Sequence, residues 1–245
     1  MFTVEIAEIP INIDNRYEHI RILCQGYLTE KDPVVSITVT EEEIQKNAET
    51  QTGREGYDEV SCVFQQIANA IIPFDAFFLH AAVLAINGKG VAFAAKSGIG
   101  KTTRLNLWEE AFGDKAQIVN GDKPVLRFLD GQLYAYGTPW KGKEINGNNV
   151  RTPLNALCFL ERSDEVSLQR ISIPETLSRI FSQVFVPEDE QSRMHFLGLI
   201  DRMIQCTPCF LLKCNKGKEK PVEIWDQMEM EILQFIQNEQ TNDGN

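Results

Sequence analysis

Eight residues from Ala95 to Thr102, with the sequence AKSGIGKT, combine two glycines, a lysine and a hydroxyl in a pattern that can hold phosphate groups. Successive backbone N–H groups of a Gly-rich turn converge on one point, and the N-terminus of a following helix adds positive charge there. Lys101 would contact the β and γ phosphates of a nucleotide, and the Thr102 hydroxyl would complete a Mg²⁺ shell. The pattern predicts a site for ATP and Mg²⁺ formed by Ser97, Gly98, Ile99, Gly100, Lys101, Thr102 and Thr103.

The surroundings of this stretch support a phosphate-binding loop rather than a chance match in a surface loop. A short apolar run at 91–94 predicts a strand before it, and good helix formers at 102–112 predict a helix after it. Strand, loop and helix are the context that the motif requires. Ala95 stands where the pattern usually has glycine, which removes a little backbone freedom and adds one methyl group.

The loop and its flanks resemble the HPr kinase/phosphorylase family and the ATP-dependent phosphoenolpyruvate carboxykinases, over roughly residues 77–162. The resemblance implies an α/β P-loop fold of that type, with a mixed sheet, flanking helices and a small β-rich N-terminal segment. His80, in the segment His80–Leu84 before the loop, matches the family's active-site histidine. Asn120-Gly121-Asp122 is similar to the family's acidic pair, one acid serving as base and the other lying near the metal.

Only the second acid of that pair is present, because Gly121 occupies the first position. The resemblance implies a catalytic role for His80, Lys101 and Asp122 and a metal role for Thr102 and Asp122, but whether Asp122 is the base, a metal ligand or both stays open. From the residues alone, Asp122 could equally form a turn before Lys123-Pro124, and His80 could be a hydrogen-bonded core residue.

Candidate substrate contacts lie further along the chain. The stretch 137–143, GTPWKGK, is a predicted loop with one large aromatic residue and two cations. Trp140 could stack on a base, and Lys141 and Lys143 could hold an anionic group of the acceptor. The alternative is a packed turn with solvated lysines. Arg162 is a further candidate of the same kind, as is Arg151.

The elements that position these residues follow from periodicity and turn chemistry. Asn87-Gly88 and Asp130-Gly131 favour tight hairpins, the first between strands at 77–86 and 91–94 and the second between strands at 125–128 and 133–136. Gly113 would cap the helix at 102–112. The same criteria predict further strands at 118–119, 154–160 and 210–213, and helices at 173–184, 191–205 and 222–237.

The chain divides by composition into a β-rich N-terminal segment, residues 1–55, and a P-loop kinase-like domain, residues 56–245. Alternation at 2–6 and at 34–39 predicts two strands, and apolar spacing at 60–71 predicts a helix that Pro73 ends. The polar stretch 41–56 is either a charged helix end or a mobile loop. An exposed strand edge is compatible with a homo-oligomer, and the oligomeric state stays open.

Composition excludes several other functions. With 24 Lys and Arg against 35 Asp and Glu, the chain has a formal net charge of −11, which argues against nucleic acid or an anionic membrane as partner. Neither a signal peptide nor an uninterrupted apolar span is evident, so a cytoplasmic location is expected. The six scattered cysteines are then reduced thiols, and neither the C-x-x-C of Cys206 and Cys209 nor any histidine predicts a metal site.

The leading hypothesis is a kinase that transfers the γ-phosphoryl group of ATP to a hydroxyl, on Ser or Thr of a protein or peptide or on a small metabolite. The alternative is a nucleotide-binding regulatory module, which Gly121 supports. A mechanical ATPase is disfavoured because the chain has neither a Leu-Ser-Gly-Gly signature nor an apolar strand that ends in Asp-Glu. The short chain disfavours a carboxykinase.

Overall fold

The computed structural model describes residues 1–50, 54–142, 147–215 and 218–242. The first part of the chain forms β1 (Phe2–Ile6), β2 (Ile9–Asp14), α1 (Glu18–Leu23), β3 (Val35–Thr38), α2 (Glu41–Thr50) and α3 (Glu55–Ala70). The remainder forms β4 (Ala76–Phe78), β5 (Ala81–Ile86), β6 (Lys89–Ala94), α4 (Lys101–Phe112), β7 (Ala116–Asn120), β8 (Val125–Leu129), β9 (Gln132–Tyr136), β10 (Arg151–Arg162), β11 (Ser167–Arg170), α5 (Ile173–Ile180), α6 (Glu190–Cys206), β12 (Cys209–Cys214) and α7 (Pro221–Asn242). The fold is mixed α/β, as the sequence predicts.

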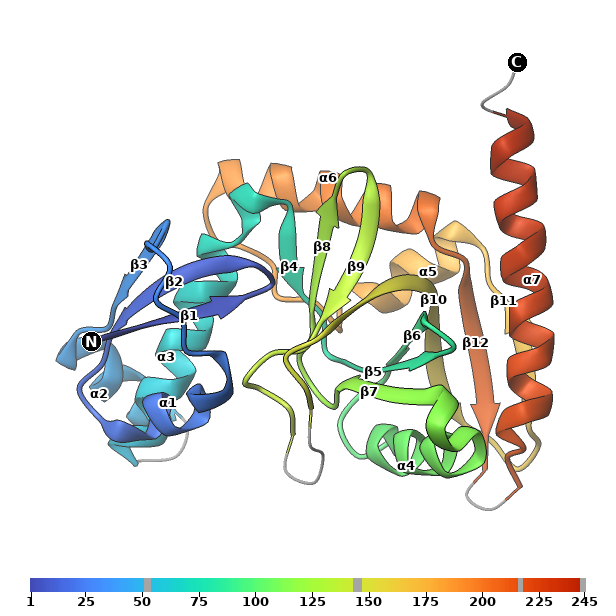
Figure 1. Ribbon diagram of the computed structural model, residues 1–245, viewed down its shortest axis with the longest axis horizontal. Coiled ribbons are helices and arrows are strands. Elements are labelled where there is room, and N and C mark those ends of the chain that lie inside the picture. The colour runs from blue at the N-terminus through green and yellow to red at the C-terminus, as the bar shows by residue number, and fades with distance from the viewer. Residues whose placement is uncertain (51–53, 143–146, 216–217, 243–245) are drawn as a thin grey trace.

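A large, curled mixed sheet forms the centre of the molecule (Figure 1). Among the described residues it has nine strands, seven of them in the order β4-β8-β9-β10-β6-β5-β7, while β12 pairs with β10 and β11 pairs with β12. The long strand β10 holds the sheet together, because its start pairs antiparallel with β9 and its later part pairs parallel with both β6 and β12.

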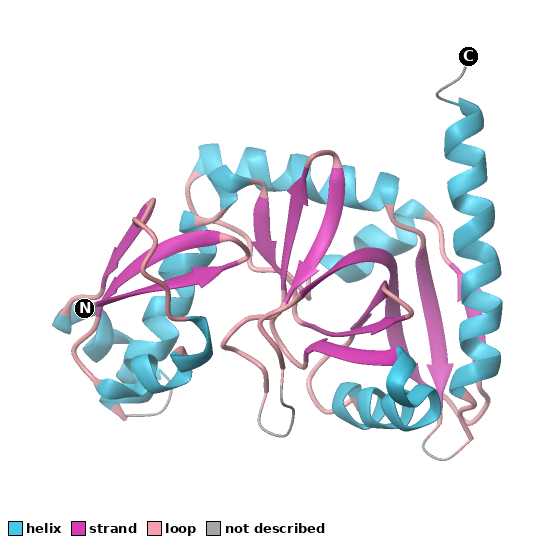
Figure 2. Cartoon of the chain, viewed as in Figure 1, coloured by secondary structure: helices cyan, strands magenta, loops and turns pink. Residues whose placement is uncertain are grey.

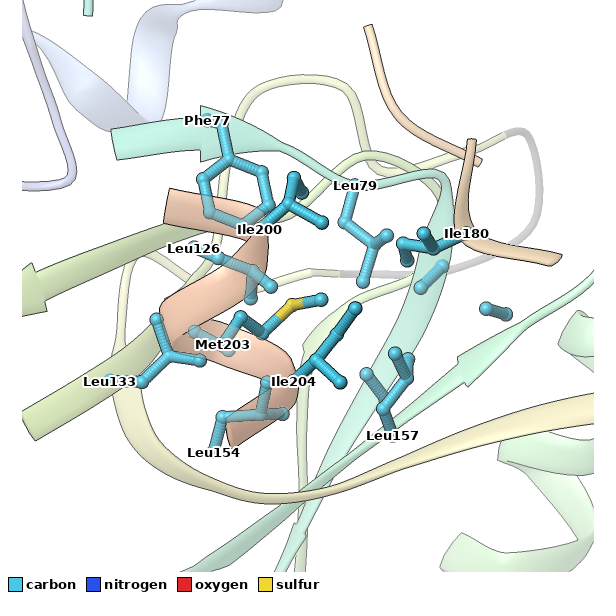
Figure 3. Close-up of a cluster of buried hydrophobic side chains, with 14 of the residues drawn as sticks. Phe77, Leu79, Leu126, Leu133, Leu154, Leu157, Ile180, Ile200, Met203 and Ile204 are labelled. Carbon is cyan, nitrogen blue, oxygen red and sulfur yellow. The ribbon is translucent and has the colours of Figure 1, made fainter. Parts of the chain in front are cut away.

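Helices cover both faces of this sheet (Figure 2). Successive residues of β5 point to opposite faces of the sheet and pack into two different hydrophobic cores. Val83 packs with α5 and α6 on one face, and Leu84 packs with α4 and α7 on the other. The α6 side of the first core is drawn in Figure 3, where Ile200, Met203 and Ile204 lie against strand residues such as Leu126. Both faces of β5 and β6 are apolar because both are buried, which is why these strands read as continuous apolar runs.

The N-terminal unit is a three-stranded sheet, β1-β2-β3, packed on α1, α2 and α3. The charged stretch 41–56, for which the sequence allowed either a helix end or a loop, contains the helix α2. The strand β2 and the helix α1 were not predicted from the sequence. Helix α3 begins at residue 55, where the predicted boundary lies, yet its Val63 and Ile67 pack with the N-terminal strands. The same core continues into Phe78 of β4 and Val125 of β8.

Both predicted hairpins are present. Asn87 and Gly88 have φ of 49° and 77°, and Asp130 and Gly131 have φ of 49° and 82°, the positive values that a two-residue turn of this kind needs. They join β5 to β6 and β8 to β9, in both cases antiparallel.

The predicted strand at 77–86 is wrong as a single element. It is two strands in different parts of the sheet, since β4 pairs with β8 whereas β5 pairs with β6 and β7. The backbone changes partners at the break: the Leu79 N–H donates to Pro124 O, and the His80 N–H donates to Gln183 O at 2.6 Å. His80 therefore lies immediately before β5 rather than inside a strand.

Candidate functional site

Five neighbouring strands bring the candidate residues to one edge of the sheet. Strands β12, β10, β6 and β7 run in one direction and end at this edge, while β5 runs the opposite way and begins there. The order of the strands, β12-β10-β6-β5-β7, sets the order of the candidate residues along the edge. These are, in turn, Asn215 after β12, Arg162 at the end of β10, the loop 95–100 after β6, His80 before β5, and Asp122 after β7.

The loop 95–100 contains two glycines in the left-handed backbone region and leads directly into α4. Gly98 and Gly100 have φ of 82° and 109°, a region that other residues rarely adopt, although a Cβ at either position would meet no neighbour within 4 Å. Backbone conformation rather than space therefore requires glycine at both. Gly100 is the N-cap of α4, so the first N–H groups of the helix, including those of Lys101 and Thr102, lack an intrahelical acceptor and face the loop.

Lys101 is turned inward from the first position of α4. The residue is 8% exposed, and its Nζ lies 2.9 Å from Ala95 O and 2.9 Å from His80 Nε2. Burial lowers the pKa of Lys101; the nearby Asp122 carboxylate acts in the opposite direction and Lys123 adds to the lowering. The side chain is thus a poorly solvated cation, which an anion arriving at the loop would stabilise.

His80 connects Lys101 to Asp122. Its Nε2 lies 2.9 Å from Lys101 Nζ and 3.3 Å from Asp122 Oδ1. One ring nitrogen either accepts a hydrogen bond or donates one, so neutral Nε2 can accept from Lys101, whereas protonated Nε2 donates to Asp122. Nε2 therefore serves one neighbour at a time, as acceptor for Lys101 or as donor to Asp122.

Asp122 is an ionised carboxylate. Burial alone raises the pKa of its side chain, but hydrogen bonds from His80 and from Lys123, whose Nζ lies 2.5 Å from Oδ2, outweigh burial and hold the pKa well below its usual range. Carboxylate and hydroxyl oxygens are ligands that Mg²⁺ accepts, and this ion typically uses one or two carboxylates together with phosphate oxygens and water. The half-buried Thr102 and Asp122 provide that donor set, so the residues present fit the ion.

Asn120 fixes the turn that presents Asp122. This fully buried amide accepts hydrogen bonds through Oδ1 from the backbone N–H groups of Asp122 and Lys123, at 2.9 and 2.8 Å. Its Nδ2 donates to the carbonyl and hydroxyl oxygens of Thr138 at 3.1 and 3.2 Å. The amide thereby joins the end of β7 to the start of the loop 137–142.

Substitution of Asn120 by alanine should lower the free energy of unfolding by roughly 1–3 kcal/mol, because the Asp122 N–H loses its acceptor and the Lys123 N–H keeps only Trp140 O. Urea denaturation followed by circular dichroism measures the loss. Asn149→Ala is the matched control, since Asn149 is exposed and donates one 3.3 Å bond to Gly26 O, and its change should stay below about 0.5 kcal/mol. Equal losses in the two variants would contradict the positioning role of Asn120.

The loop 137–142 lies beside Asp122 and does not present Trp140 for base stacking. The Trp140 ring packs edge-on against Phe64 and Phe78, with centroids 5.2 and 5.7 Å away. Its carbonyl accepts from the Lys123 N–H at 3.1 Å, and a Cβ on Gly142 would lie 3.5 Å from Asp122 Cβ. Of the two options open for this aromatic ring, the packed turn is the one formed.

The predicted substrate cations have different positions. Lys141 lies in the loop beside Asp122, with its side chain against Gly147. Lys143 lies outside the described residues. Arg162 lies on the opposite side of the loop 95–100 from Asp122, and its Nη2 donates to Gly98 O at 2.5 Å. Arg151 pairs with Glu8 of the N-terminal unit, remote in sequence from the loop.

The remaining sequence expectations concern metals and thiols. Among the described residues, no cluster of three or more His, Cys, Asp or Glu side chains could hold a metal ion. None of the described cysteines forms a disulfide: Cys206 is exposed, and Cys209 and Cys214 lie at opposite ends of β12. His195 pairs with Asp75 at 2.8 Å on the surface. None of the described helices combines the length and apolarity needed to cross a membrane.

Sequence reasoning missed the charged pair beneath the loop. Arg104 of α4 donates to Glu219 from Nε and Nη2 at 2.6 and 2.5 Å, and Trp108 Nε1 donates to the same carboxylate at 3.1 Å. Arg104 and Trp108 are one helical turn apart, a spacing that could have indicated a shared partner. Glu219 lies in a polar segment of alternating lysines that carries no comparable signal.

Comparison with known proteins finds a likeness only among solved structures. The sequence matches no known family model and no curated protein. Among solved structures, the HPr(Ser) kinase/phosphatase from Coxiella burnetii is similar at 13% identity, with a TM-score of 0.43, over 69% of this chain and 98% of that one. The family resemblance of residues 77–162 stays a prediction.

Proposed function

We propose that this protein binds ATP with Mg²⁺ at the loop 95–100 and transfers the γ-phosphoryl group to a hydroxyl of a protein, a peptide or a small metabolite. The observation that carries the proposal is the contact between Lys101, His80 and Asp122 beside the first turn of α4. The Lys101 cation, the His80 imidazole and the Asp122 carboxylate contact one another there, beside a glycine-containing loop that leads into a helix N-terminus. These contacts support the chemistry that the motif predicts.

Phosphoryl transfer requires charge neutralisation and in-line positioning more than covalent chemistry. Lys101 supplies a desolvated positive charge at the loop, and the backbone N–H groups at the start of α4 supply fixed dipoles. Bound Mg²⁺, held by Thr102 and Asp122, would neutralise further phosphate charge. Asp122, ionised and half-buried, can also accept the proton of an acceptor hydroxyl, and His80 can hold that carboxylate in place.

A nucleotide-binding regulatory module is the second candidate. Gly121 lacks a side chain where the resembled family carries an acid, and the Asp122 carboxylate is held by both His80 and Lys123. A protein of this kind would bind the nucleotide but leave its γ-phosphate in place. The two candidates share every prediction about binding and differ only in turnover.

Transfer of label from γ-³²P-ATP, with Mg²⁺ and with cell extract or hydroxyl-bearing peptides as acceptors, separates them. A kinase gives a labelled acceptor, and Asp122→Asn should slow labelling by about 10²-fold to 10⁴-fold, the usual worth of a general base. Asp130→Asn, at an exposed hairpin turn, is the matched control and should label at the wild-type rate. Nucleotide binding without any labelled acceptor would reject the kinase and favour the regulatory module.

A further inference from the structure

A cleft of about 590 Å³ opens on the side of the phosphate loop away from Asp122. Its walls come from the loop, from the outward side of α4, and from the ends of β10 and β12; its lining includes Gly98, Leu107, Arg162, Asp164, Asn215 and Glu219. A volume of this size suits a nucleoside-sized ligand. The chemistry assigned to Lys101, His80 and Asp122 does not use it.

We propose that this cleft holds the base and ribose of the nucleotide, so that the bound molecule lies across the loop with its γ-phosphate toward Asp122. The inference rests on the proposed function and adds the direction of the nucleotide and the residues that contact its base. The strand order supports it, because the loop after β6 lies between β10 and β12 on one side and β5 and β7 on the other. Phosphates held at the loop leave the nucleoside only the β10 and β12 side if the γ-phosphate is to reach Asp122.

The cleft wall has the chemistry that a planar base needs. Leu107 and Ile99 are partly buried apolar side chains on facing parts of the lining, α4 and the loop. The guanidinium of Arg162 is a planar cation anchored on Gly98 O, and such groups stack on aromatic faces. The Asn215 amide and the Asp164 carboxylate bring donors and acceptors that can read the edge of a base.

The floor of the cleft is rigid and charged. Arg104 and Glu219 both contribute to the lining, and their side chains are 7% and 3% exposed. Their bidentate pair ties α4, which starts at the phosphate loop, to the segment that precedes α7. The width of the cleft is therefore set independently of any ligand, as expected for a preformed site.

Isothermal titration with Mg²⁺-tripolyphosphate and with Mg²⁺-ATP tests the inference on the wild-type protein. ATP should bind about 10-fold to 100-fold more tightly, the range that base stacking provides. Leu107→Trp should fill the cleft and remove this difference while leaving tripolyphosphate affinity unchanged. Leu197→Trp is the matched control, because Leu197 is a half-exposed leucine on α6, the helix that covers the other face of the sheet.

The outcomes separate the inference from the function on which it rests. Equal affinity for ATP and tripolyphosphate in the wild type would overturn the inference but leave the phosphate site intact. An ATP preference that survives both Leu107→Trp and Asn215→Ala would also overturn it, because the base would then bind elsewhere. Failure of both probes to bind would refute the phosphate site itself, and the proposed function with it.

Discussion

Replacing Lys101 by methionine should slow phosphoryl transfer by roughly 10³-fold or more, the loss seen when a cation that neutralises transition-state charge is removed. The methionine side chain is similar in length to lysine. The loop nevertheless loses the only positive side chain that the described structure brings into contact with His80 and Ala95 O. Single-turnover labelling with γ-³²P-ATP measures the rate. Lys115→Met, an exposed lysine before β7, is the matched control for the loss of one positive charge.

The same substitution should leave the ligand-free protein at least as stable as the wild type, since it removes a desolvated cation. Because burial lowers the pKa of Lys101 in the folded state below its ordinary value of 10.5, the unfolded chain binds more protons in the alkaline window just below that value. Wild-type stability therefore gains a contribution as the pH rises through this window, and Lys101→Met lacks that gain. A variant that melts well below the wild type at pH 7 would show that Lys101 is structural instead.

Glu219→Gln should destabilise the fold by about 3–5 kcal/mol, because it leaves the buried Arg104 cation without its carboxylate. Burial by itself lowers the pKa of Arg104, and the hydrogen bonds to Glu219 reverse that effect. Since folded domains are stable by only about 5–15 kcal/mol, urea denaturation should reveal a large shift in midpoint. Trp108 fluorescence should change as well, because its indole N–H shares the carboxylate.

The control for this prediction lies four residues along the chain. Glu223 forms an ion pair with Lys220 at 2.7 Å, but both side chains are about 70% exposed, so Glu223→Gln should cost less than about 1 kcal/mol. A double variant with Arg104→Met and Glu219→Leu should recover part of the loss, since a buried pair can be replaced by apolar groups of similar volume. Equal losses at Glu219 and Glu223 would show that burial does not set the cost of losing the carboxylate.

Elements with a local physical cause were predictable from the sequence. The turns at Asn87-Gly88 and Asp130-Gly131 form where residues tolerate positive φ, and α4 starts directly after the second loop glycine. Positions that depend on the route of the chain were not predictable. The apolar run through Leu79 carries no signal of its change of partner strand, because both strands are buried and both read as apolar.

The candidate site shows the same division. The motif at residues 95–102 was sufficient to predict the positions of Gly98, Gly100 and Lys101, because its residue spacing determines the conformation of the loop. The sequence marked Asn120 only as part of the tripeptide Asn120-Gly121-Asp122. Its positioning role depends on Thr138, which the hairpin of β8 and β9 brings close to it. Glu219 depends on a partner 115 residues away, and nothing in its neighbourhood marks it as buried.

The hydrophobic core that runs from β1 and α3 into Phe78 and Val125 bears on how such a protein can diversify. A recombination event that exchanged residues 1–55 alone would replace more than half of this core and leave α3 against strands it was never selected to fit. Phe64 of α3 also contacts Trp140 in the loop beside Asp122, so a mismatch there would reach the acid. The two parts of the chain are therefore expected to be inherited together, and residues that contact one another across this shared core are expected to covary.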